Sequence, residues 1–107
     1  MAEFIIGEDH NGSTVSARVG DSIILKLPEV PATAFRWELG TVDSQSLALS
    51  RDEFEATSQA IGGGGLRVLY FVAKKAGSVD LQLKLARPWE SGTTKNVFRV
   101  RITITSS

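Results

Sequence analysis

The sequence predicts an all-β protein with an immunoglobulin-like antiparallel β-sandwich of about seven or eight strands. Short segments of alternating polar and apolar residues recur along the chain, and Gly- and Pro-containing turns separate them at regular spacing. No segment of useful length shows the 3.6-residue apolar period of a helix. The 107 residues are enough for one domain with one core, so we expect a single domain over residues 1–107.

Two short strands are expected near the N-terminus, at residues 3–6 (EFII) and 13–19 (STVSARV). Asn11-Gly12 lies between them, and Asn-Gly is the strongest short signal for a hairpin turn. We therefore expect the two segments to pair as a β-hairpin. Asn11 also begins a glycosylation sequon that ends at Ser13, but we favour the turn interpretation.

Three strands are expected in the middle of the chain. Residues 21–27 (DSIILKL) and 35–39 (FRWEL) alternate apolar and polar side chains, which is typical of a strand with one buried face. Residues 47–56 (LALSRDEFEA) show this pattern more weakly. Trp37 is the expected core tryptophan of the sandwich.

Three more strands are expected toward the C-terminus. Residues 66–73 (LRVLYFVA) are apolar on both faces, which is typical of a central strand. Residues 78–85 (SVDLQLKL) and 96–105 (NVFRVRITIT) alternate again, with apolar side chains on one face.

If these strands alternate in direction, three connections meet at one end of the sandwich. We call them the first loop (28–35), the second loop (60–66) and the third loop (86–92). They contain the least ordinary residues of the chain, which are Pro31, the four glycines 62–65 and Arg87-Pro88-Trp89. Loops at one end of a sandwich commonly form a binding surface, so this end is the expected functional site.

Trp89 has two interpretations. The ring can fold back and cap the end of the sandwich with Arg87 stacked on it. Alternatively, it can face outward as a binding anchor, since Trp and Arg are enriched among the residues that dominate interfaces. Pro88 restricts the backbone and so lowers the entropy cost of presenting the ring. The neighbouring unusual loops favour the binding interpretation.

The glycine run 62–65 does not match a phosphate-binding loop, because no Lys-Ser/Thr pair and no helix follow it. It is either a tight or flexible turn, or a segment whose bare backbone lies close against a partner's main chain.

Composition excludes several functions. Lys+Arg and Asp+Glu are both 12, so a nucleic acid or an anionic membrane is not an expected partner, although Arg99 and Arg101 could form a local basic stripe. The chain has no Cys and one His, His10, so we expect no disulfide, metal site, cofactor or catalytic triad. Without a recognisable acid, base or nucleophile, the sequence predicts a protein that is not an enzyme.

The N-terminal residues lack the basic and apolar regions of a signal peptide, and no apolar stretch reaches the about 20 residues of a membrane helix. We expect a secreted or periplasmic protein if a leader has been removed, and a cytoplasmic one otherwise. We also expect a monomer.

The three loops resemble those of chagasin-type inhibitors of papain-like cysteine proteases. That family carries the motifs N-P-T-T-G-[FY], G-x-G-G and R-P-W, in this order. The corresponding segments here are VPATAF (30–35), GGGG (62–65) and RPW (87–89). VGDSIILKLP (19–28) and AKKAG (73–77) add to the similarity, which extends over roughly residues 15–105.

The resemblance implies a reversible, tight-binding competitive inhibitor of papain or cathepsin L-type proteases, whose three loops block the active-site cleft. It implies protease contacts for three sets of residues. These are Val30, Pro31, Ala32, Thr33, Ala34 and Phe35 in the first loop, Ile61, Gly62, Gly63, Gly64, Gly65 and Leu66 in the second, and Arg87, Pro88, Trp89 and Glu90 in the third.

The first loop departs from the family motif at three positions. Ala32 replaces the Thr that approaches the protease Cys–His pair in the family, so Thr33 is expected to support the loop or to take over a contact. Ala34 replaces a Gly that tolerates positive φ, and Val30 replaces an Asn that can hydrogen-bond within the loop.

An alternative function is an immunoglobulin-like adhesion or carbohydrate-binding module that uses Trp89 as a stacking platform. Such a module has no need of the glycine run or of Pro31.

Overall fold

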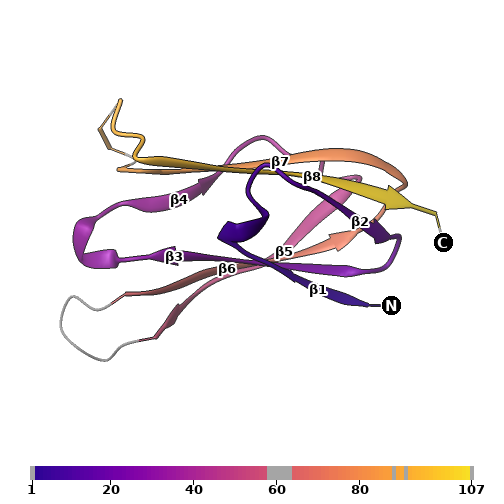
Figure 1. Cartoon of the computed structure of the whole chain (residues 1–107), viewed down its shortest axis with the longest axis horizontal. Coiled ribbons are helices and arrows are strands. Elements are labelled where there is room, and N and C mark those ends of the chain that lie inside the picture. The colour runs from indigo at the N-terminus through magenta and orange to yellow at the C-terminus, as the bar shows by residue number, and fades with distance from the viewer. Residues whose placement is uncertain (1, 58–63, 88, 91, 107) are drawn as a thin grey trace.

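The computed structural model describes residues 2–57, 64–87, 89–90 and 92–106. Figure 1 shows two sheets stacked face to face. The strands are β1 (Glu3–Ile6), β2 (Thr14–Arg18), β3 (Ser22–Glu29), β4 (Arg36–Leu39), β5 (Leu47–Ala56), β6 (Gly65–Ala73), β7 (Gly77–Ala86) and β8 (Asn96–Thr105). Two single 3-10 turns, η1 (Glu8–His10) and η2 (Pro31–Thr33), complete the described elements. The predicted all-β sandwich is confirmed.

The two sheets contain four strands each, in the orders β1-β3-β6-β5 and β2-β8-β7-β4. All neighbouring pairs are antiparallel except β1 with β3 and β2 with β8, which are parallel. β6 is a central strand, as its apolar residues on both faces predicted. Among the described residues, no helix is long and apolar enough to cross a membrane.

The predicted hairpin between residues 3–6 and 13–19 is wrong, because β1 and β2 lie in different sheets. Asn11-Gly12 does form a turn, and Gly12 has the positive φ of 82° that suits glycine. However, the turn is held by β8: the Arg99 N–H donates to Asn11 Oδ1 (2.9 Å), and the Gly12 N–H donates to the Arg99 carbonyl (2.7 Å). The dipeptide therefore indicated a change of direction correctly, but it could not indicate which strand each flanking segment joins.

The core lies between the sheets and consists of the alternating side chains that the sequence pattern identified. Its largest fully buried members include Phe71, Phe98, Leu25, Leu81 and Ile102. Trp37 packs against the margin of this core and is half-buried, with its indole N–H donating to the Pro28 carbonyl at 2.8 Å. The expected core tryptophan therefore lies at the edge of the core, beside the first loop.

The end of the sandwich opposite the loops is fixed by a buried carboxylate. Asp21 is only 4% exposed and accepts hydrogen bonds from the N–H groups of Ala2 (2.9 Å) and Arg18 (2.8 Å). These backbone hydrogen bonds lower the pKa of Asp21 below its ordinary value of 3.8. The carboxylate thus joins the start of β1 to the β2–β3 turn.

Candidate functional site

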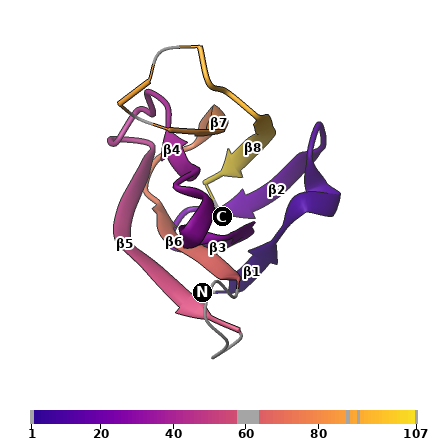
Figure 2. The same ribbon diagram turned by 90° about the vertical axis from the view of Figure 1, so that its left-hand side faces the viewer.

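The described parts of the three unusual loops lie at one end of the sandwich, as alternating strand directions predicted. The end of β3 pairs with the start of β6 (Glu29 with Gly65), and the start of β4 pairs with the end of β7 (Arg36 with Ala86). Figure 1 shows the strand ends that flank these loops at the left and both chain termini toward the right, and Figure 2 looks onto the loop end. Within the second loop, Ile61, Gly62 and Gly63 fall outside the described residues, as does Pro88 of the third loop.

The first loop contains a short 3-10 turn over Pro31–Thr33, and this turn ends at Ala34. Ala34 has φ 64° and is the only described non-glycine residue with a positive φ. The sequence departure at this position is therefore a real conformational cost, since a Cβ disfavours the left-handed region. The Ala34 N–H donates to the Pro31 carbonyl at 2.9 Å, which closes the turn.

Thr33 supports this turn from within. Its hydroxyl donates to the Val30 carbonyl at 2.7 Å, and its N–H donates to the same carbonyl at 3.1 Å. The Phe35 N–H lies 3.4 Å from the same hydroxyl oxygen. Of the two roles expected for Thr33, the structure therefore shows loop support. Pro31 and Ala32 form the exposed outer edge of the turn.

The third loop presents Trp89 to solvent. Trp89 is 63% exposed, which is the largest exposed fraction among the large hydrophobic residues that the structure describes. Thr93 holds the base of this loop, because its hydroxyl oxygen accepts from the Arg87 N–H at 3.0 Å and lies 3.0 Å from the Glu90 carbonyl oxygen. The Glu90 N–H donates to the Arg87 carbonyl at 3.1 Å.

Arg87 joins the third loop to the first. Its Nε donates to the Thr33 carbonyl at 3.3 Å, and its guanidinium carbon lies 4.5 Å from the centre of the Phe35 ring. The Lys95 ammonium lies 5.2 Å from the same ring centre. The alternative in which Trp89 caps the sandwich with Arg87 stacked on it is therefore wrong, because Arg87 stacks on Phe35 and Trp89 faces outward.

The described end of the second loop uses its glycines for internal packing. A Cβ on Gly65 would lie 2.3 Å from the Glu55 carbonyl and 2.5 Å from the Phe54 ring, so no side chain fits there. A Cβ on Gly64 would lie 3.4 Å from the Val30 side chain, which places the first and second loops in contact. Leu66 is half-buried in β6. For Gly65, the bare backbone therefore serves the pairing of β5 with β6.

An ion pair beneath these loops was missed by sequence reasoning. The Glu29 carboxylate is buried (2% exposed) and lies 2.7 Å from Arg67 Nη2. Burial lowers the pKa of Arg67, but hydrogen bonds and charge from Glu29 and Asp52 outweigh it, so the pKa is raised above its ordinary value. A signal was present, because Glu29 continues the inward alternation of Leu25 and Leu27 and is therefore a charge at a buried strand position.

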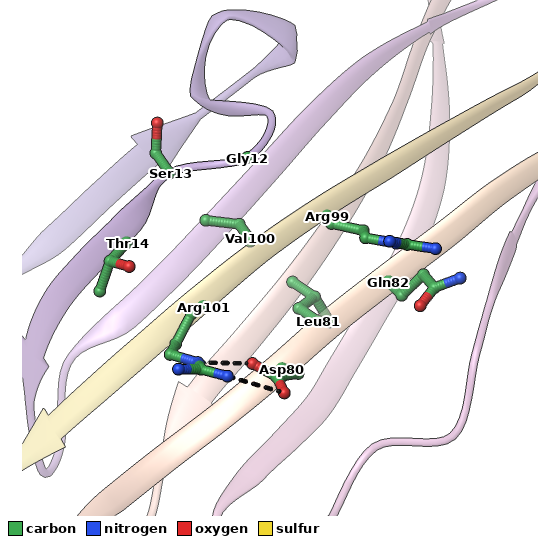
Figure 3. Close-up of a pocket in the computed structure, with 9 residues that line it drawn as sticks. All are labelled: Gly12, Ser13, Thr14, Asp80, Leu81, Gln82, Arg99, Val100 and Arg101. Carbon is green, nitrogen blue, oxygen red and sulfur yellow. Dashed lines mark hydrogen bonds and ion pairs between the residues drawn. The ribbon is translucent and has the colours of Figure 1, made fainter.

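The described residues contain no cluster of three or more His, Cys, Asp or Glu that could hold a metal ion. The His10 ring Nδ1 instead accepts from the Gly7 N–H at 3.1 Å within its own turn. Arg99 and Arg101 do lie on one face of β8, but Arg101 pairs with Asp80 at 2.8 Å, as Figure 3 shows. The local basic stripe is therefore partly neutralised.

Comparisons with known proteins agree with this arrangement. The family described as Chagasin family peptidase inhibitor I42 matches residues 16–104. Chagasin from Trypanosoma cruzi is 34% identical over 85 residues, which cover 75% of this chain and 77% of that protein.

Two solved structures share the fold. The crystal structure of the cysteine protease inhibitor EhICP2 from Entamoeba histolytica has a TM-score of 0.88 at 24% identity, covering 97% of this chain and 96% of that one. A structure of PbICP-C in complex with falcipain-2 has a TM-score of 0.72 at 15% identity, covering 96% and 89%.

Proposed function

The chain belongs to the chagasin family of peptidase inhibitors, and we propose that its three loops block the active-site cleft of papain-like cysteine peptidases, reversibly and in competition with substrate. The resemblance found in the sequence is thus confirmed at the level of the family, and the protein is an inhibitor rather than an enzyme. The observation that carries the proposal is the loop end itself, where Arg87 hydrogen-bonds the first loop, Gly64 lies beside Val30 and Trp89 of the third loop faces outward.

The first loop is suited to the centre of a cleft. It is narrow, its exposed edge consists of Pro31 and Ala32, and internal hydrogen bonds from Thr33 and Ala34 hold its shape. A preformed loop loses little conformational entropy on binding. Such a loop inhibits by filling the cleft, which requires no chemical step, so the missing hydroxyl at Ala32 does not remove this mechanism.

The other two loops provide flanking contacts. Trp89 of the third loop is an exposed aromatic anchor beside Arg87 and Glu90, a combination typical of residues that dominate binding energy. We assign main-chain contacts with the peptidase to the second loop, from Ile61 to Leu66. Gly64, which lies beside Val30 of the first loop, supports this assignment.

The backbone of the first loop also accounts for resistance to cleavage. Peptide segments that pair with an edge strand do so in an extended conformation. Residues 31–33 form a 3-10 turn, and Ala34 has the left-handed conformation, so the loop does not present an extended bond. We therefore expect the chain to remain intact in the complex.

The test is inhibition of papain and cathepsin L by the purified protein. We expect competitive kinetics, with the inhibitor recovered uncleaved between residues 28 and 35 by mass spectrometry. A serine peptidase such as trypsin serves as the control that should not be inhibited. The proposal would be overturned if the protein inhibited neither papain nor cathepsin L at micromolar concentration.

A further inference from the structure

Glu29 is a charged group at a position where a strand normally places an apolar side chain. It is the last residue of β3, it immediately precedes the first loop, and only 2% of its side chain is exposed. Burying a carboxylate is costly unless it is fully paired. Here every contact is made by groups that flank the loops.

The carboxylate closes the base of the first loop. Glu29 Oε1 accepts from the Trp37 N–H at 2.8 Å, and Trp37 lies in β4 just after the loop. The indole N–H of Trp37 donates back to the Pro28 carbonyl at 2.8 Å. Trp37 is the donor in both hydrogen bonds, and together they join the strands that enter and leave the first loop.

The other carboxylate oxygen extends this connection toward the second loop. Glu29 Oε2 accepts from Arg67 Nε (3.2 Å) and Nη2 (2.7 Å). Arg67 lies near the start of β6, and its Nη1 donates to Asp52 of β5 at 3.2 Å. One guanidinium thus joins the end of β3 to the two strands that enter and leave the second loop.

We propose that Glu29 and Arg67 are positioning residues for inhibition, which set the first and second loops in one arrangement without themselves contacting the peptidase. Replacing a buried ion pair with apolar residues of similar size is often neutral or stabilising, so stability alone is a weak explanation for a charged pair at this position. The hydrogen bonds of this network join four strands and are directional. They therefore fix the orientation of the loop bases, which apolar packing does not. This inference rests on the proposed function.

A second carboxylate–guanidinium pair lies away from the loops and serves as a matched control for Glu29 and Arg67. Asp80 and Arg101 also join carboxylate to guanidinium with two hydrogen bonds, of 2.8 and 3.4 Å, but both side chains are exposed (72% and 58%). Figure 3 shows them on the outer face of β7 and β8. Exposed pairs of this kind contribute little to stability.

The experiment compares equivalent substitutions at the two pairs. Glu29→Gln keeps an acceptor for Trp37 but removes the charge that Arg67 requires. We expect it to raise the inhibition constant for papain by about tenfold, because the loop is then ordered only on binding. Amide hydrogen exchange at Thr33 and Ala34, measured by NMR on the free protein, should become faster. Asp80→Asn should leave both quantities unchanged within about twofold.

Three further variants support the test. If circular dichroism shows that Glu29→Gln is unfolded, the double variant Glu29→Gln with Arg67→Gln replaces it, because two neutral amides can still pair. Ile102→Val removes a methylene from the buried core and should lower the melting temperature without changing the inhibition constant. Arg67→Lys keeps the charge but not the forked donors, so we expect an intermediate effect.

The outcomes separate the two proposals. A wild-type protein that inhibits neither papain nor cathepsin L overturns the proposed function, and loop hydrogen exchange alone then decides whether the pair positions the loops. If the wild type inhibits, an unchanged inhibition constant in a folded Glu29 variant overturns the positioning role. An equal effect of Ile102→Val overturns it as well, because the effect would then follow from overall stability.

Discussion

The two ends of this sandwich are fixed by different means. At the loop end, contacts between side chains and neighbouring segments hold the loops together. Arg87 contacts Thr33 and Phe35 of the first loop, and Glu29 forms an ion pair with Arg67 of β6. At the opposite end, one carboxylate, Asp21, accepts hydrogen bonds from backbone N–H groups and stabilises the turn before β3. Substitutions at the loop end should therefore change inhibition more than stability, and substitutions at the other end should do the reverse.

The largest expected effect concerns Trp89, which makes little contact with the rest of the fold. Trp89→Ala should weaken papain inhibition by about 2 kcal/mol, or roughly 30-fold, because exposed aromatic anchors dominate interface energies. The melting temperature should not change. An unchanged inhibition constant would show that Trp89 is not an anchor.

A smaller effect in the opposite direction is expected from restoring the family motif in the first loop. Ala32→Thr combined with Ala34→Gly adds a hydroxyl at the outer edge and removes the Cβ from a residue with φ 64°. We expect papain inhibition to tighten by about 1 kcal/mol, or roughly fivefold. Weaker inhibition would mean that the loop is shaped for a different cleft. Ala34→Gly alone separates the backbone contribution from that of the hydroxyl.

Thr33→Val tests the internal support of the same loop. The change removes the hydroxyl that donates to the Val30 carbonyl but keeps the side-chain shape. A single hydrogen bond of this kind contributes about 0.5–1.5 kcal/mol. We expect a several-fold rise in the inhibition constant with almost no change in chemical denaturation, whereas Thr33→Ser should behave like the wild type.

The smallest effect on inhibition is expected from a lower pH, because it protonates Asp21 at the end of the sandwich opposite the loops. The pKa of Asp21 is lowered in the folded chain, so its contribution to stability is present above the unfolded pKa of about 3.8 and is lost as the pH falls through the folded pKa. The pKa of Asp80 is also lowered, by its hydrogen bond from Arg101, so its contribution to stability is lost in acid as well. Denaturation curves should therefore shift to lower denaturant concentration below about pH 4. Asp21→Asn should flatten this dependence, and an unaltered pH profile would contradict the role of Asp21.

Much of the fold could be predicted because alternating patterns identify buried strand faces directly. Residues 3–6, 47–56 and 96–105 are strands with the predicted bounds, and strand direction alone placed the three loops together. The hairpin prediction failed because a turn dipeptide encodes local geometry, whereas the choice of partner strand depends on the whole sandwich. The positive φ of Ala34 was indicated only by the resemblance to a motif with Gly at that position.

The interactions between loops were harder to predict than the loops themselves. Glu29 and Arg67 are far apart in the sequence, and each alone resembles an ordinary surface charge. Their pairing follows from the β3–β6 register, which no local pattern reveals. The stacking of Arg87 on Phe35 was missed for the same reason, since it joins two loops that meet only in the folded chain.

The parallel pairing of β2 with β8 has a mechanical consequence. β2 lies near one end of the chain and β8 near the other, and their paired residues run from Thr14 with Arg101 to Arg18 with Thr105. A force that draws the two ends of the chain apart pulls these strands in opposite directions along their length. The hydrogen bonds between them then bear the load together and do not open one after another. The sandwich should therefore resist stretching through its termini while its loop end remains undeformed.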